Sequence, residues 1–139
     1  MKITDLMLGN WVSTPEGVYR VDTIQENDVI GTDYNNGEGI DSMFDADEVN
    51  PVLLTEEIME KNGFEKVQNL RVLKWDNKVF PSMIFIEYNP VNHCIFINDM
   101  MLPKPVMFVH ELQIILHMCG INKDIVLRSS AYQLSENKQ

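Results

Sequence analysis

The residues best able to do chemistry lie in the segment FVHELQIILHMCG, Phe108 to Gly120, where His110 stands beside Glu111. Zinc proteases carry two helical histidines four residues apart, because that spacing puts both imidazoles on one face, one turn apart. Here the next histidine is His117, seven residues after His110, which is about 10 Å further along a helix axis. Zinc–nitrogen bonds of about 2.0–2.1 Å would span that gap only in a strained geometry. The segment therefore predicts no zinc site.

The same segment has the spacing of a core helix. Val109, Leu112 and Leu116 recur at helical intervals, and Phe108, Ile115 and Cys119 extend the stripe. His110, Gln113 and His117 fall on another side of the helix, and Glu111 is a first-turn acid favoured by the helix dipole. We treat five residues as a candidate polar cluster to be tested: His93, His110, Glu111, Gln113 and His117.

Nucleophilic catalysis is not predicted. Cys94 and Cys119 stand in apolar runs, where burial raises the pKa of a thiol instead of activating it. His93 adjoins Cys94, but neighbours on a strand point to opposite faces. The sequence contains no Gly-x-Ser-x-Gly, P-loop or Gly-x-Gly-x-x-Gly motif. We therefore assign no catalytic residue, metal ligand or cofactor, and the two cysteines indicate small buried hydrophobes in a reducing cytoplasm.

The acidic run DSMFDADE, residues 41–48, was compared with a calcium loop. An EF-hand needs oxygen ligands at alternate positions and a glycine at the sixth place. Met43 stands between Asp41 and Asp45, and the sixth-place glycine is missing. The run is instead a candidate acidic surface formed by Asp41, Asp45, Asp47 and Glu48.

Charge is distributed unevenly along the 139 residues. The net charge is −10; residues 1–52 contain two basic and eleven acidic side chains, whereas residues 53–139 contain nine and ten. Such a balance repels nucleic-acid phosphates and anionic membranes, so we do not expect direct binding to either. No stretch approaches the roughly 20 apolar residues of a membrane helix. The acidic N-terminal part is either a solubilising surface or a face that meets a basic protein partner.

The N-terminal 52 residues predict a small β-domain. Extended segments are expected at 10–12, 18–24, 29–34, 40–44 and 49–52, with a one-turn helix at 45–49. Short strands separated by tight turns favour a barrel or sandwich. About five strands in this length suit an SH3-like barrel, strongly acidic, over residues 1–52.

Residues 53–139 predict an α+β region. Thr55 is a good N-cap for a short helix that Gly63 ends. An antiparallel three-strand meander follows at 70–75, 82–88 and 94–98, because the connections are too short for parallel crossovers. The longest helix is expected from Val106 to Cys119 with Gly120 as its C-cap, and an edge strand at 124–127. The predicted fold class is thus α+β, an SH3-like barrel followed by a meander with two packed helices.

Two segments carry a resemblance. PVLLTEEIMEKNGFEK, residues 51–66, resembles the Leu-Thr-Glu-Glu…Gly-Phe-Glu-Lys segment of a family of small uncharacterised prophage and mobile-element proteins of gut anaerobes. FVHELQIILHMCG resembles that family's later Val-His-Gln-Leu-Gln segment, although Glu111 stands where glutamine is usual and Ile114 where asparagine is usual. The resemblance implies an accessory cytoplasmic role in a mobile element and no particular chemistry.

Three functions follow as hypotheses. The first is a non-enzymatic protein-interaction or adaptor module that binds through its acidic N-terminal surface. The second is an acidic inhibitor that imitates nucleic acid and blocks a host DNA-binding protein, which requires one contiguous stripe of carboxylates. The third is an enzyme of unrecognised type, which requires a cleft joining His93, His110 and Glu111.

Overall fold

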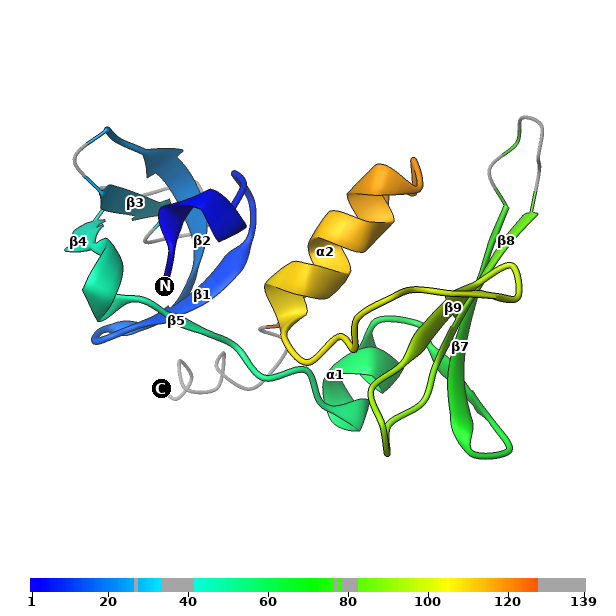
Figure 1. Cartoon of the computed structure of the whole chain (residues 1–139). Coiled ribbons are helices and arrows are strands. Elements are labelled where there is room, and N and C mark those ends of the chain that lie inside the picture. The colour runs from blue at the N-terminus through cyan, green and yellow to red at the C-terminus, as the bar shows by residue number, and fades with distance from the viewer. Residues whose placement is uncertain (27, 34–41, 77, 79–82, 128–139) are drawn as a thin grey trace. The chain divides into compact units, whose positions relative to one another are not determined.

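The computed structural model describes residues 1–26, 28–33, 42–76, 78 and 83–127. It is a mixed α+β protein with two antiparallel five-stranded sheets and two α-helices (Figure 1). Two compact units divide the chain. The first comprises Met1–Leu53 with Met107–Ile115, and the second comprises Leu54–Val106 with the chain from Leu116 onward.

The first sheet has the strand order β4-β3-β2-β1-β5. Its strands are β1 (Trp11–Thr14), β2 (Gly17–Ile24), β3 (Val29–Asp33), β4 (Ser42–Asp45) and β5 (Asn50–Pro51). The 3-10 helices are η1 (Ile3–Asp5) and η2 (Ala46–Glu48), and η2 confirms the predicted one-turn helix. The five predicted extended segments all correspond to strands. Among the described residues the strands form an open sheet and do not close into a barrel.

The core of the first unit is a cluster of apolar side chains from four strands and from the residues that directly follow η1 and η2. It consists of Leu6, Val12, Val21, Ile30, Phe44 and Val49. The strand β2 lies between β1 and β3, and its pairing with β3 shifts register between Val21 and Thr23, a bulge that bends a strand.

The second sheet has the strand order β10-β9-β8-β7-β6. The predicted meander is present as β7 (Leu70–Asp76), β8 (Met83–Tyr88) and β9 (Ile95–Ile97). Two short edge strands that the sequence analysis missed extend it: β6 (Glu65–Val67) and β10 (Met100–Met101). Both are joined to their neighbours by two-residue hairpin turns, in which Gln68, Asn98 and Asp99 take positive φ angles.

The helix α1 (Glu56–Lys61) begins and ends as predicted. The Thr55 side chain accepts a hydrogen bond from the Ile58 N–H at 3.2 Å. At the other end Gly63 has φ +90° and donates to Glu60 O, while Phe64 N–H donates to Met59 O. These two bonds form a Schellman motif, which needs a residue that tolerates positive φ.

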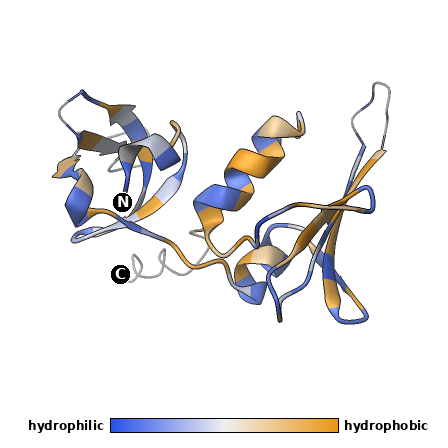
Figure 2. Ribbon diagram, viewed as in Figure 1, coloured by the Kyte–Doolittle hydropathy of each residue, from blue (hydrophilic) through white to orange (hydrophobic). Residues whose placement is uncertain are grey.

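The helix α2 (Val109–Met118) is shorter than predicted at its start. Val106 N–H donates to His93 O, and Phe108 forms an isolated β-bridge with Leu53, so these residues are held in extended conformation. Its C-terminus is as predicted: Gly120 has φ +75°, and Ile121 N–H donates to Leu116 O. Val109, Leu112 and Leu116 are buried as the core stripe requires, and Figure 2 shows hydrophobic and hydrophilic bands along this helix.

The predicted edge strand at 124–127 is wrong, because these residues form no strand. The backbone of Val126 is instead bound by a side chain. Asn62 Oδ1 accepts from Val126 N–H at 2.8 Å, and Asn62 Nδ2 donates to Val126 O at 3.0 Å. A buried amide thus takes the place of a neighbouring strand.

No helix among the described residues is both long and apolar enough to span a membrane.

Candidate functional site

The turn between β2 and β3 lies beside the turn that follows β4. Asp28 takes φ +62° in the first turn, and its carbonyl accepts the Ala46 N–H at 2.8 Å. The register of the two strands explains this contact, since Val29 pairs with Asp45. Antiparallel pairing therefore brings together acidic residues that are about 17 positions apart in sequence.

The 3-10 helix η2 and its N-cap residue Asp45 hold three more carboxylates, those of Asp45, Asp47 and Glu48. Glu48 Oε1 accepts the Asp45 N–H at 3.0 Å, which closes the start of the turn. The amino group of Met1 donates to Ala46 O at 3.0 Å and to Val49 O at 3.1 Å. The N-terminal residue thus fixes the position of η2 through its backbone carbonyls.

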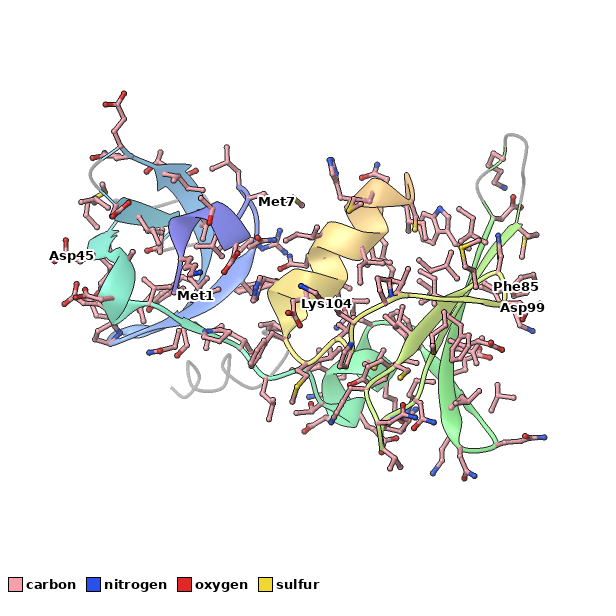
Figure 3. All side chains as sticks on the ribbon, viewed as in Figure 1. Met1, Met7, Asp45, Phe85, Asp99 and Lys104 are labelled. Atoms are coloured by element: carbon pink, nitrogen blue, oxygen red, sulfur yellow. The ribbon has the colours of Figure 1, made fainter. Side chains whose placement is uncertain are left out.

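These segments form what we call the acidic end of the first sheet: Glu26, Asp28, Asp45, Asp47 and Glu48, all exposed. A surface pocket of about 340 Å³ lies there, lined by Met1, Asp28, Asp45, Ala46 and Asp47. Figure 3 labels Met1 and Asp45 in this part of the molecule. Within the described residues, none of the five carboxylates forms an ion pair with a basic group.

The chemistry available to the acidic end is attraction of positive charge. In the part of the chain that the structure describes, no three His, Cys, Asp or Glu side chains gather closely enough to hold a metal ion. Exposed carboxylates with open space between them suit lysine or arginine side chains, which bring their own donors and keep partial hydration. The site is therefore a candidate docking surface for a basic segment.

Three of the four predicted acidic-surface residues, Asp45, Asp47 and Glu48, lie in the acidic end. Asp41 lies outside the described residues. Glu26 and Asp28 were not among the predicted residues of this surface. They could have been predicted from the antiparallel pairing of β3 and β4. In such a pair, the turn before the first strand and the turn after the second lie at the same end of the sheet.

Gln113, from the candidate polar cluster, fixes α2 against the start of β1. Its Oε1 accepts the Trp11 N–H at 2.9 Å and the Asn10 Nδ2 at 3.5 Å. Its Nε2 donates to Gly9 O at 3.0 Å. All hydrogen-bonding atoms of this side chain are thereby used in holding the first unit together.

Glu111 has a capping role. Its Oε1 accepts the N–H groups of Met107 at 2.9 Å and Phe108 at 3.1 Å, which lie just before α2. These are N–H groups that the helix itself cannot satisfy. The carboxylate also lies at the positive end of the helix dipole, as predicted.

His110 is 5% exposed, and its Nδ1 has no hydrogen-bond partner among the described residues. Its ring stacks with that of Phe108 at a centroid distance of 6.0 Å. Burial lowers the pKa of His110 below its ordinary value, while the negative charges of Glu111 and Asp5 oppose this effect. The imidazole is thus neutral in the folded protein over a wider pH range than in the unfolded chain.

This burial predicts a pH dependence of stability. With a lowered folded-state pKa, the unfolded chain binds more protons between that value and about 6.5, so stability falls as the pH decreases below about 6.5. We expect the urea-unfolding free energy of H110F to fall less steeply than that of the wild type in this range. H117Q, which alters the exposed histidine of the same helix, is the matched control. Parallel pH profiles for H110F and the wild type would contradict the prediction.

His93 lies in the second unit, in the loop between β8 and β9, with φ +66°. Its Nδ1 is 2.8 Å from the buried Tyr88 hydroxyl, which is 3.2 Å from Val106 O. A carbonyl only accepts, so for both contacts to be hydrogen bonds the hydroxyl donates to Val106 O and His93 Nδ1–H donates to the hydroxyl. His93 therefore supports the loop through one defined tautomer.

The residues of the candidate polar cluster make separate contacts within their own units. His110, Glu111 and Gln113 contact different groups of the first unit, whereas His93 contacts groups of the second. His117 is exposed. Burial raises the pKa of the Cys119 thiol, which agrees with the expectation that it is not an activated nucleophile.

Comparison of the chain with protein-family models, with curated proteins and with solved structures finds no match.

Proposed function

We propose that this protein is a non-enzymatic interaction or adaptor module that binds a basic segment of another protein at the acidic end of its first sheet. One observation carries the proposal. Three exposed carboxylates, Asp28, Asp45 and Asp47, line a pocket, and Glu26 and Glu48 belong to the same two turns. Met1 also lines this pocket, but its amino group is bound to the carbonyls of Ala46 and Val49, and within the described residues none of the five carboxylates forms an ion pair.

The negative charge of the first unit is concentrated at the acidic end of its sheet. Exposed carboxylates contribute little to the stability of their own fold, so their concentration at one end is better explained by an external partner. At physiological ionic strength the Debye length is about 8 Å, and carboxylates grouped within adjacent turns act together over that range. Such a surface raises the association rate of a positively charged partner and makes binding salt-dependent.

The fold context of the site is part of the proposal. A 3-10 helix stands between β4 and β5, and β5 returns to pair with β1. Together with the bulged β2, this order supports assigning the first unit to the SH3-like small β-domains, which bind peptides in other proteins. The resemblance to mobile-element proteins supports a cytoplasmic accessory role.

The alternative hypotheses receive less support. A nucleic-acid mimic needs a stripe of carboxylates, but Glu16 lies in the β1–β2 hairpin, at the other end of β2 from the acidic end. An enzyme using His93, His110 and Glu111 needs these side chains at one cleft. In the structure Glu111 caps a helix and His93 supports a loop, so both side chains are used in structural hydrogen bonds.

The test uses a fluorescent lysine-rich peptide and the full chain. We expect binding at low salt that weakens steeply as salt is raised. D28N/D45N should weaken low-salt binding about three- to tenfold, since each exposed charge contributes up to about 1 kcal/mol. Asn tolerates the positive φ of Asp28, so the fold should survive. Fluorescence anisotropy at two salt concentrations measures both effects.

The matched control is E16Q/D22N, which removes the same number of carboxylates from the same unit but away from the acidic end. It should retain most of the low-salt affinity. Equal losses in both double variants would mean that only net charge matters, and the proposed site would be wrong. Absence of any salt-sensitive binding would also overturn it.

A further inference from the structure

The two faces of the second sheet differ in what covers them. Residues that pair across neighbouring strands have their side chains on the same face of the sheet. Leu73 and Ile86 therefore lie on one face, and Lys74 and Phe85 lie on the other. Leu73, Ile84, Ile86 and Tyr88 are buried and define the inner face. The opposite side, which carries Phe85, is called here the outer face.

The outer face carries several exposed apolar side chains beside charged ones. Antiparallel sheets normally present polar side chains on their solvent side. Here Met83 is 38% exposed, Phe85 40% and Met101 55%, and Phe96 is half-buried beside Met101. Figure 3 labels Phe85 on this sheet. Register links these side chains across three neighbouring strands, so they form one surface instead of scattered exposed residues.

Two opposite charges stand at the middle of the outer face. Val72 pairs with Glu87, and Lys74 pairs with Phe85. Neither Lys74 nor Glu87 forms an ion pair within the described residues. Neighbouring strands lie about 4.8 Å apart, and residues two apart on a strand lie about 6.7 Å apart. Four side chains therefore occupy the corners of a rectangular cell: Val72, Lys74, Phe85 and Glu87.

We infer that the outer face of the second sheet binds a second copy of this chain, in a two-fold dimer whose sheets pack face to face. The two-fold axis lies between the two sheets. It is perpendicular to the Lys74–Glu87 diagonal and passes over the midpoint of that diagonal, so Lys74 of each copy faces Glu87 of the other. The axis then runs close to Phe85, so the exposed Phe85 side chains of the two copies meet, whereas Val72 near the same axis is 8% exposed and is covered within its own chain. The strands of the two sheets cross steeply, as in orthogonal sheet packing.

A second copy fits this face because a two-fold interface must be complementary to itself. The unpaired lysine and glutamate at opposite corners meet that condition, and the surrounding methionines and phenylalanines supply the apolar contact area. Each copy carries a net charge of −10, so the dimer is expected at physiological salt, where screening limits the repulsion between copies.

Sedimentation velocity of the full chain, from low micromolar to near-millimolar concentration, tests the inference. The wild type should show a reversible monomer–dimer equilibrium. F85E places two like charges next to each other at the axis and should raise the dissociation constant about a hundredfold or more. V91E changes an apolar side chain that is 83% exposed in a loop of the same unit, and it should leave the equilibrium unchanged.

Charge exchange supplies a second readout that does not depend on F85E. K74E and E87K should each raise the dissociation constant about tenfold, because each sets like charges against one another. The double variant K74E/E87K restores opposite charges across the axis and should recover most of the wild-type association. A wild type that stays monomeric at all concentrations overturns the inference. So does a dimer that is insensitive to F85E, or a double variant that is no better than the single ones.

Discussion

Trp11→Ala is expected to lower the free energy of unfolding by about 3–5 kcal/mol, the range for truncating a large buried aromatic side chain. Trp11 begins β1 and is 2% exposed. The Arg20 guanidinium lies 4.7 Å from the centre of the Trp11 ring. The backbone N–H of Trp11 donates to Gln113 Oε1. Alanine would leave a cavity at the point where β1, β2 and α2 meet in the first unit.

Urea unfolding followed by far-UV circular dichroism measures this loss. W11F, which keeps an aromatic ring under Arg20, should cost clearly less than W11A. R20A removes a cation–π contact worth about 0.5–1 kcal/mol and should cost less than W11A. The chain has two tryptophans, so in W11A the fluorescence of Trp75 reports on the second unit alone. A loss in W11A no larger than that in R20A would mean that the Trp11 ring is not part of the core.

Asn62→Ala is expected to lower the free energy of unfolding by about 2–4 kcal/mol, because it removes three partly buried hydrogen bonds and leaves their partners unpaired. Asn62 is 5% exposed and follows α1 directly. Its amide donates to Ile58 O at 2.8 Å and also binds both backbone groups of Val126. Without it, the segment that carries the buried Ile125 loses these bonds to α1.

The control is N122A, which removes an exposed asparagine near the same segment and should change stability by less than about 0.5 kcal/mol. Hydrogen exchange gives a local readout, since the Val126 amide should lose protection in N62A and keep it in N122A. Equal stability of the two variants would contradict the role assigned to Asn62.

Features that depend on a few neighbouring residues were predicted correctly from the sequence. The Thr55 cap and the glycines that end α1 and α2 are examples. Their geometry is decided within one helical turn, by a side-chain oxygen that reaches a nearby N–H or by a residue that accepts positive φ. The central strands β7, β8 and β9 were also predicted, because their apolar runs and short connections permit only antiparallel neighbours.

Features that depend on distant partners were not predicted correctly. Residues 124–127 have the composition of a strand, but the Asn62 amide binds Val126 in place of a strand neighbour. The expected helical turn at 106–108 is extended, since Val106 bonds to His93 O and Phe108 pairs with Leu53. The intrinsic preference of a short segment for helix or strand is weak, and hydrogen bonds to distant residues override it.

The same division holds for the candidate sites. The sequence by itself determined the α+β class, the acidic N-terminal part and the lack of a zinc-protease motif, because these follow from composition, period and spacing. Only the tertiary structure decided that Asp28 lies beside Asp45, that Gln113 binds β1, and that Phe85 faces outward while Ile86 is buried. Each of these depends on strand register, which is set by long-range pairing and by which face is buried.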